Sequence, residues 1–393
     1  MTDTIQYIDG VAISNKRVLL RVDFNVSLNP DFTIANDARI AQSLPTIEYL
    51  LKNGNRLILV SHLGRPKGID AALSLKPVAD KLQQYLPRQK ILLVKDFLNG
   101  NNKNIFDDQT SSQVLLLENS RFYPGEKSND PEFSKSLSRL ADVYVNDAFA
   151  VSHREEASTV GVTKFLPAYG GLLMKKEITM ISKAIRNPQK PLIAIIGGAK
   201  ISTKIGLLDR LSKLADHVLV GGGLANTFLC AKGYNIGTSY CETDQVEIAK
   251  KLMANTNIIL PNDVVIGDKE AGGGKSEVVE LTKVPSDKAI YDIGPETQAI
   301  FGAYIAKAKT IVWNGPVGYI ENPDFRRGTD FIYYSITHNE GATSIVGGGD
   351  TLAAISKKEY LDKITHISTG VGAMLEFIEK GTLPGIEALK KST

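Results

Sequence analysis

Short runs of apolar residues recur along the chain, and longer amphipathic segments separate most of them. One such segment, residues 40–51, repeats its apolar residues at helical spacing and stops at Gly54, and another spans 205–214. Continuous apolar strands that alternate with helices are typical of parallel sheets covered on both faces. We therefore predict an α/β protein. The predicted strands are residues 18–22, 57–60, 91–94, 114–117, 143–145, 192–196, 218–220, 258–260, 311–313 and 343–346.

The length of the chain predicts two domains. A chain of 393 residues is longer than a domain with a single hydrophobic core usually is, and the predicted strands are too many for one small sheet. The segment 165–171 contains Pro167 and two glycines between helical patterns. The segment 172–185 that follows reads as a helix ending before Pro188, and could couple the domains.

Composition excludes several classes of function. Hydrophobic residues make up 43% of the chain, charged residues 23%, and the net charge is +3. This balance argues against nucleic acid or an anionic membrane as the main partner. Cys230 and Cys241 form no disulfide framework, no apolar stretch has membrane-spanning length, and the first residues lack a signal-peptide pattern. We expect a cytoplasmic protein.

In the first half, polar and cationic side chains follow most of the predicted strands. Ligands of open α/β sheets bind beyond the carboxyl ends of the strands, and arginine forks bind phosphate or carboxylate. Each arginine alone could be a solvated loop residue, and each histidine a helix cap or core residue. The cluster favours a small, multiply charged anion whose hydroxyl group could bond Asp23 or Asn25. The candidates are Asp23, Asn25, Arg39, His62, Arg65, Arg121, His153 and Arg154.

The second half opens with a glycine turn after the run 192–196. Residues 197–204 read Gly-Gly-Ala-Lys-Ile-Ser-Thr-Lys, which is not a Walker P-loop. If a helix begins here, Lys200 and Lys204 share one face of its first turns, where free N–H groups favour polyphosphate. The alternative is an ordinary strand-to-helix turn with two solvated lysines.

Three further glycine clusters follow strands, at 221–223, 313–318 and 347–351. The last places three glycines before a predicted helix, which would present successive N–H groups to an anion. Asp350 could cap that helix or hold Mg²⁺ through one carboxylate. Glu321 could bind ribose hydroxyls or be an exposed loop carboxylate.

The two halves together favour phosphoryl transfer between two bound anions. No serine–histidine–aspartate set and no cysteine–histidine metal spacing is evident. Phosphoryl transfer needs positioning and charge neutralisation more than a covalent nucleophile.

These motifs, in this order and spacing, resemble those of the phosphoglycerate kinase family, in its bacterial form, over essentially the whole chain. The matching segments are residues 21–26, 61–66, 117–119, 147–149, 197–200, 313–318, 347–351 and 368–370.

The resemblance implies two Rossmann-like domains, each a parallel sheet covered by helices, joined by a hinge. It implies a 3-phosphoglycerate domain at 1–170, a nucleotide domain at 171–379, and a tail at 380–393 that packs back on the first domain. It further implies a monomer with small-molecule partners only, and reversible transfer between 1,3-bisphosphoglycerate and MgADP, giving 3-phosphoglycerate and MgATP, with domain closure about the hinge. A non-catalytic anion- or nucleotide-binding protein on the same fold is the alternative.

The resemblance also assigns roles to residues. Lys200 and Arg39 resemble the pair that stabilises the transferring phosphoryl group, and Asp350 the residue facing Mg²⁺. All the candidate residues of the first half except His153 resemble the family's phosphoglycerate-binding residues. We add His153 to this set because it also follows a predicted strand, next to Arg154. The nucleotide site is expected at Lys204, Asn314, Glu321, Gly347, Gly348, Gly349, Asp350 and Thr351.

Two positions depart from the family pattern. Ser27 stands where the family usually has proline. The loss of the φ restraint that proline provides loosens the loop modestly. Val371 stands where it usually has glycine, and valine strongly disfavours positive φ. Neither change removes a charged ligand, so we expect activity to survive.

Overall fold

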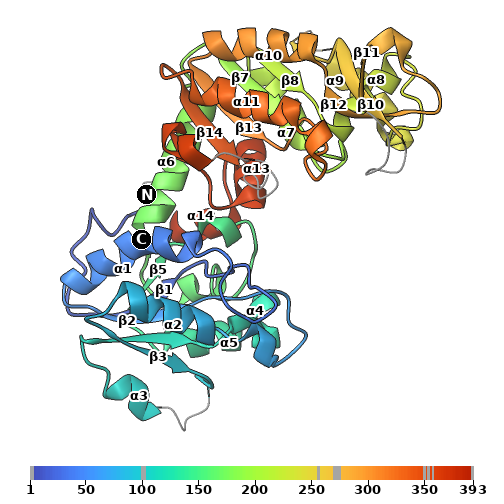
Figure 1. Ribbon diagram of the computed structural model, residues 1–393. Helices are drawn as coiled ribbons and strands as arrows, with labels where there is room; N and C mark the ends of the chain where they lie inside the picture. The colour runs from blue at the N-terminus through green and yellow to red at the C-terminus, as the bar shows by residue number, and fades with distance from the viewer. Residues whose placement is uncertain are drawn as a thin grey trace. The chain divides into compact units, whose positions relative to one another are not determined.

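The computed structural model describes residues 4–98, 103–254, 257–268, 276–347, 351, 355 and 358–390. The chain divides into two compact units (Figure 1). Unit 1 comprises Met1–Thr179 and Lys380–Thr393, and unit 2 comprises Met180–Glu379. Helix α6 (Leu172–Arg186) therefore begins in unit 1 and ends in unit 2.

Unit 1 contains a six-stranded parallel sheet in the order β3-β4-β2-β1-β5-β6. β1 lies between β2 and β5, with Arg21 paired to Val60 on one side and to Asn146 on the other. The carboxyl ends of these three strands consequently meet at one edge of the sheet. The strands are β1 (Arg17–Arg21), β2 (Arg56–Val60), β3 (Lys90–Val94), β4 (Gln113–Leu117), β5 (Val143–Asn146) and β6 (Ala168–Gly170).

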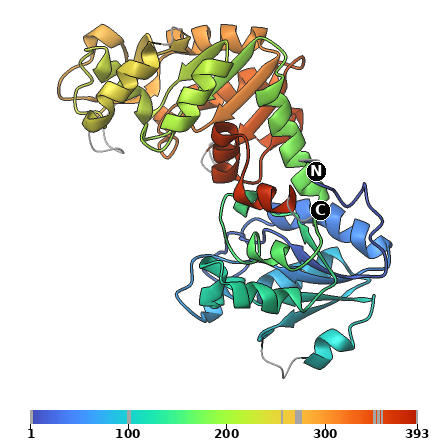
Figure 2. The ribbon, with the colours of Figure 1, turned by 180° about the vertical axis from the view of Figure 1, so that it is seen from behind.

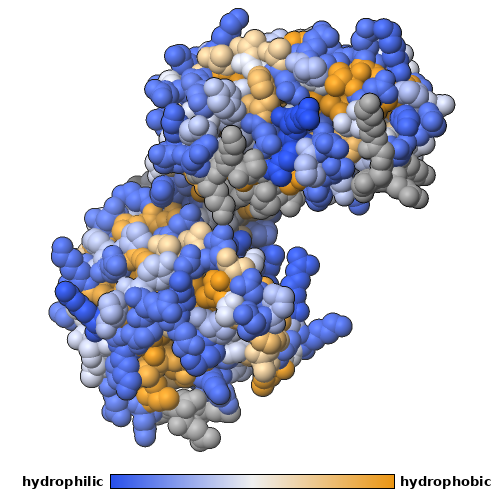
Figure 3. Space-filling model, viewed as in Figure 1, coloured by the Kyte–Doolittle hydropathy of each residue, from blue (hydrophilic) through white to orange (hydrophobic). Residues whose placement is uncertain are grey.

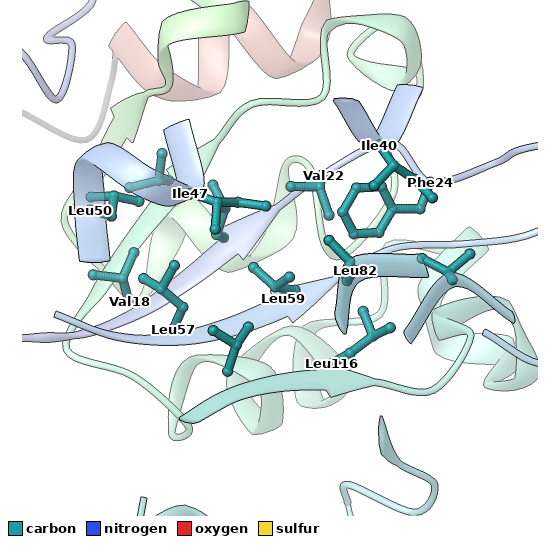
Figure 4. Close-up of a cluster of buried hydrophobic side chains, with 14 of the residues drawn as sticks. Val18, Val22, Phe24, Ile40, Ile47, Leu50, Leu57, Leu59, Leu82 and Leu116 are labelled. Carbon is teal, nitrogen blue, oxygen red and sulfur yellow. The ribbon is translucent and has the colours of Figure 1, made fainter. Parts of the chain in front are cut away.

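One face of this sheet packs against α1 (Ala38–Lys52) and α2 (Lys76–Tyr85). Figure 4 shows Val18, Leu57 and Leu59 of the strands beneath Ile47 of α1, within a cluster of buried side chains. Alternate strand residues face the other way, since Leu19 and Ile58 are also fully buried. Burial on both faces explains why these strands read as unbroken apolar runs.

Shorter helices complete unit 1. Figures 1 and 2, which view the chain from opposite sides, place α1 and α2 on one face of the sheet and α5 on the other. The remaining helices are α3 (Lys103–Asp107), α4 (Pro124–Lys127), α5 (Pro131–Ser138) and α14 (Pro384–Lys390), with 3₁₀ turns η1 (Ala71–Leu73), η3 (Ser120–Phe122), η4 (Phe149–Val151) and η5 (Gly161–Lys164).

Unit 2 contains a second six-stranded parallel sheet, in the order β15-β14-β13-β7-β8-β9. The expectation of two α/β units, each built on a parallel sheet with helices, is thereby confirmed. The strands are β7 (Leu192–Ile196), β8 (His217–Val220), β9 (Ile258–Ile259), β13 (Thr310–Asn314), β14 (Thr343–Gly347) and β15 (His366–Ile367).

Trp313 marks the core of unit 2. Its side chain is fully buried, and its indole N–H donates to the carbonyl oxygen of Gly315 at 2.9 Å. It packs in a cluster with Phe301 of α10 (Pro295–Lys307) and Ile332 of α11 (Arg327–Thr337). Trp313 is therefore a core residue of unit 2.

A three-stranded antiparallel sheet, ordered β11-β10-β12, extends unit 2 and was not expected. It comprises β10 (Asp263–Gly267), β11 (Glu277–Glu280) and β12 (Ala289–Ile293). Its edge strand β11 is mostly exposed, so it lacks the buried apolar run that reveals the other strands.

The other elements of unit 2 are α7 (Ile205–Leu214), α8 (Gly223–Ala231), α9 (Val246–Met253), α13 (Val371–Lys380), η6 (Thr243–Gln245), η7 (Leu281–Lys283), η8 (Pro323–Phe325) and η9 (Lys358–Lys363). No helix in the described part of the chain combines the length and apolar character needed to cross a membrane. On the face drawn in Figure 3, hydrophobic residues form small separate patches in a mostly hydrophilic surface.

Candidate active site

The carboxyl edge of the sheet in unit 1 carries a cluster of charged side chains. Asp23 follows β1, His62 and Arg65 follow β2, Arg121 lies in η3 after β4, and Arg154 follows β5. Arg154 interacts electrostatically with Arg121, Glu156, Arg65 and Asp23, and these charges therefore form one local field. Burial, followed by the charge of Arg121, lowers the pKa of Arg154 below its ordinary value.

Asp23 and Asn25 are both engaged within the protein. One carboxylate oxygen of Asp23 accepts from the guanidinium of Arg39, near the start of α1, and the other accepts from the Asn25 N–H at 3.2 Å. Asn25 Oδ1 accepts from the Gly64 N–H at 2.8 Å, where the backbone has φ +64° and favours glycine. A ligand oxygen would thus meet the amide nitrogen of Asn25 more readily than its oxygen.

His62 is a neutral hydrogen-bond donor. Its side chain is 1% exposed, and its Nδ1 lies 3.1 Å from an Arg21 Nη2. Because a guanidinium group only donates, Nδ1 accepts and the ring proton is on Nε2. Burial and then the charges of Arg21, Arg121, Arg154 and Arg39 hold the pKa of His62 well below its ordinary value.

Arg21 belongs to a buried network that the sequence reasoning missed. Its Nε donates to Ser158 Oγ at 2.8 Å, and Ser158 Oγ donates to Glu126 Oε1 at 2.5 Å. The Ser158 N–H donates to the other oxygen of Glu126 at 3.1 Å. Burial raises the pKa of Glu126, while the Arg21 charge opposes that rise. The sequence did offer one signal for this network, because Arg21 is the only charged residue in the otherwise apolar run 18–22.

Arg121 and His153 are also held by neighbouring groups. Arg121 Nη1 donates to the Gly64 carbonyl at 2.9 Å, and Arg121 Nη2 pairs with Glu156 at 2.6 Å. Arg154 Nε donates to His153 Nε2 at 3.3 Å. Arg65 differs from these residues because it is exposed. Glu156 was also missed, since nothing in its local sequence marks it as buried.

The glycine turn of unit 2 is a strand-to-helix turn and not the first turn of a helix, so the structure selects one of the two alternatives that the sequence leaves open. α7 begins at Ile205, so Lys204 precedes the helix and Lys200 lies in the turn before it. Gly198 has φ +105°, and the Gly197 and Gly198 N–H groups bond the carbonyls of Asn314 and Pro316. These bonds hold the turn against the end of β13. Lys204 Nζ donates to the Gly197 carbonyl at 2.5 Å, and Lys200 is exposed.

A cavity of about 600 Å³ joins three of the glycine clusters in unit 2. This volume suits a small-molecule ligand. Gly222, with φ +69°, leads into α8, and a Cβ there would lie 2.8 Å from the Pro316 carbonyl oxygen, so only glycine allows this approach. The lining residues are Gly198, Ala199, Gly222, Gly223, Asn226, Thr238, Tyr240, Ala289, Ile290, Tyr291, Pro316, Gly318, Tyr319, Ile320 and Glu321.

Asn314 and Thr351 are buried and tie the ends of β13 and β14 together. Asn314 Nδ2 donates to the Gly347 carbonyl at 2.6 Å, and Thr351 Oγ1 donates to the same oxygen at 3.0 Å. The Gly315 N–H donates to Thr351 Oγ1 at 2.7 Å. Gly348, Gly349 and Asp350 lie outside the described residues. Among the residues described, no group of three or more His, Cys, Asp or Glu could hold a metal ion.

The two departures from the family pattern lie in ordinary backbone. Ser27 is exposed, and its carbonyl accepts from the Ala35 N–H at 2.9 Å. Val371 is the first residue of α13 and is not among the residues of positive φ. Valine therefore meets no left-handed strain at this position.

A family model described as phosphoglycerate kinase matches residues 8–381. The chain belongs to the phosphoglycerate kinase family. Phosphoglycerate kinase of Koribacter versatilis is 46% identical, with 97% of this chain and 98% of that protein aligned. A relative from Nicotiana tabacum, named "Phosphoglycerate kinase, cytosolic", is 44% identical over 96% of each chain.

Solved structures of phosphoglycerate kinases have the same fold. That of Coxiella burnetii has a TM-score of 0.89 and 39% identity, and that of Pyrococcus horikoshii a TM-score of 0.86 and 32% identity. Each comparison covers 99% of both chains. As a phosphoglycerate kinase, the protein is a phosphotransferase with a carboxyl group as acceptor, acting between 1,3-bisphosphoglycerate and ADP. The alternative of a non-catalytic binding protein is not favoured.

Proposed function

We propose that unit 1 is the 3-phosphoglycerate-binding domain and that its charged strand-end cluster is the substrate site. The observation that carries this proposal is the convergence of arginines with a neutral, buried His62 at one sheet edge. Arginine forks suit phosphate and carboxylate, and the His62 Nε2–H supplies a directed donor. The proposed residues are Asp23, Asn25, Arg39, His62, Arg65, Arg121, His153 and Arg154.

The nucleotide site is proposed in the cavity of unit 2. The backbone of the glycine turns suits close approach of a phosphate chain, and Glu321, which lines the cavity, is proposed to accept ribose hydroxyls. Asn314 and Thr351 are proposed to contribute by fixing the end of β13 against Gly347. Lys204, Gly347, Gly348, Gly349 and Asp350 complete the proposed set.

Lys200 and Arg39 are proposed to stabilise the transferring phosphoryl group. Cationic groups aimed at charge that develops in the transition state lower the barrier without strengthening ground-state binding. Since the two residues belong to different units, the transfer requires closure about a hinge. Arg39 is held by Asp23.

Mg²⁺ is proposed to accompany the nucleotide, with Asp350 as its protein ligand. A single carboxylate suits Mg²⁺, which binds proteins through one or two carboxylates together with substrate phosphates. When bound, the ion would neutralise charge on the phosphate oxygens. We further propose a cytoplasmic monomer, in keeping with two free cysteines and with the relative named cytosolic.

The Lys200→Ala variant tests this assignment. We expect kcat for Mg²⁺-dependent ADP formation from ATP and 3-phosphoglycerate to fall by about 10²–10³-fold. The affinity for 3-phosphoglycerate, measured by calorimetry, should change little. Lys307→Ala is the matched control, because Lys307 is an exposed lysine at the end of α10, outside the proposed site. Equal losses of kcat and of 3-phosphoglycerate affinity would refute the role of Lys200.

A further inference from the structure

A buried carboxylate lies among the arginines of unit 1, where an anion is proposed to bind. Glu156 is 5% exposed. Its Oε1 lies 2.6 Å from Arg121 Nη2 and 3.9 Å from Arg154 Nη1. Its Oε2 is buried without a hydrogen-bond partner among the described residues. A negative charge therefore lies next to the arginines that would otherwise attract a substrate anion.

The backbone holds Glu156 in this position. Its N–H donates to Thr159 Oγ1 at 3.2 Å, and its carbonyl accepts from the Thr159 N–H at 3.1 Å and the Val160 N–H at 2.8 Å. Arg121 is fixed on its side by the Gly64 carbonyl and by the Asn119 side chain, which accepts the Arg121 N–H at 3.2 Å. The pair is thus built into the fold and is not a loose surface contact.

Glu156 differs from the other acids of the cluster. Both carboxylate oxygens of Glu126 accept from Ser158, and both oxygens of Asp23 have partners. Glu156 leaves one buried oxygen unpaired, which costs stability. Its charge balances the buried guanidinium of Arg121, and because Arg154 lies nearby it also acts on the field of the whole cluster.

The charge of Glu156 offsets part of the positive field. The cluster contains five guanidinium groups, those of Arg21, Arg39, Arg65, Arg121 and Arg154, against three carboxylates. Glu156 acts most directly on Arg121, the most deeply buried arginine of the proposed substrate set. An anion bound near Arg121 would feel both the attraction of the guanidinium and the repulsion of the Glu156 carboxylate.

We propose that Glu156 limits the affinity of this site for small multivalent oxyanions. It holds Arg121 in place while weakening its attraction for anions, so that free phosphate or sulfate binds only weakly and the phosphorylated acid leaves after transfer. This inference rests on the proposed substrate site in unit 1. Glu156 is here a residue that tunes affinity through Arg121, not a group that contacts the reacting atoms.

The Glu156→Gln variant removes the charge and keeps an oxygen that can accept from Arg121. At a separation of about 7 Å and an effective dielectric constant of about 20–40, one unit charge alters anion affinity by about five- to fiftyfold. We expect the dissociation constants of 3-phosphoglycerate and of sulfate, measured by calorimetry, to fall by at least fivefold. KM for 3-phosphoglycerate should fall while kcat does not rise, because the product leaves more slowly.

Glu155→Gln is the matched control. Glu155 precedes Glu156 in the chain and is exposed, so the same change in net charge is screened by solvent. Its anion affinities should change less than twofold. Should Glu156→Gln not fold, as judged by circular dichroism, Glu156→Asn makes the same charge change, still offers an amide oxygen to Arg121, and carries the same expectation.

Weaker or unchanged binding in the Glu156 variants would overturn the proposal, because it would mean that the carboxylate acts only as a clamp for Arg121. Equal effects of Glu155→Gln and Glu156→Gln would also overturn it, by showing a general effect of net charge. Failure of the proposed substrate site has a separate signature. The wild type would then not bind 3-phosphoglycerate, whereas sulfate binding would still tighten in Glu156→Gln.

Discussion

Replacing Asp292 by Asn should change the pH dependence of stability in unit 2. Asp292 lies in β12 and is 2% exposed. One carboxylate oxygen accepts from the Gly328 N–H at the start of α11, at 2.8 Å, and the other from the Ile293 N–H at 2.9 Å. Burial raises the pKa of Asp292 to about 7, and these two hydrogen bonds only partly oppose the rise. Asn cannot ionise but keeps an oxygen for Gly328.

The sign of the effect follows from the two states of the carboxyl group. Its pKa is near 3.8 when unfolded and about 7 when folded. Between these values the folded state holds a proton that the unfolded state has released, so rising pH favours unfolding. The stability contribution is complete below about pH 4 and lost above about pH 7. The full loss is about 4 kcal/mol, of which roughly half or more falls between pH 5 and pH 8.

Urea unfolding followed by tryptophan fluorescence measures this effect in the relevant unit, because Trp313 is the only tryptophan and is buried in unit 2. Between pH 5 and pH 8, the wild type should lose about 2–3 kcal/mol more unfolding free energy than Asp292→Asn. Asp324→Asn, which changes an exposed carboxylate, should track the wild type. A difference between wild type and Asp292→Asn that does not vary with pH would refute the reasoning, since it would place the titration of Asp292 at the same pH in both states.

Two further predictions concern unit 1. Arg65→Ala should raise the dissociation constant of 3-phosphoglycerate by about tenfold or more, because a charged hydrogen bond to an anion is lost, and an unchanged constant in calorimetry would contradict the placement of Arg65 in the site. The ¹⁵N NMR spectrum of His62 should show a neutral ring, protonated at Nε2 and bare at Nδ1, between pH 5.5 and 8. A ring that gains a second proton in that range would mean that Arg21 does not control its tautomer.

The strands were predictable because burial on both faces leaves a local signature. Leu192–Ile196 is apolar at every position and buried at every position. In the antiparallel sheet, β11 had no such signature, since it carries glutamates at both ends and is mostly exposed. β10 of that sheet is buried at every position but was not predicted. β15, which is His366–Ile367, has no apolar run. Local pattern thus predicts most strands of the two parallel sheets and misses the antiparallel sheet.

The residues of the candidate site also fall into those that the sequence suggests and those that it does not. Residues such as His62 and Arg121 were found because parallel strands bring their carboxyl ends to one edge, a rule that needs only the order of elements. Arg21, Ser158 and Glu156 were missed because their roles depend on contacts between distant parts of the chain. Arg21 and Ser158 are 137 residues apart in sequence. The sequence left open whether residues 197–204 begin a helix, because the bonds that fix this turn go to Asn314 and Pro316, which are distant in the sequence.

The two proposed sites would bind anions by different physical means, and this difference would determine which substitutions each tolerates. In unit 1 the donors are side chains held by ion pairs, as Arg39 is by Asp23 and Arg121 by Glu156. A change of charge there alters affinity without requiring the backbone to move. In unit 2 the cavity is walled by glycine backbone, and a single Cβ at Gly222 would collide with the Pro316 carbonyl. Substitutions there act through shape, so adding one methyl group to unit 2 should disturb binding as much as removing a charge from unit 1.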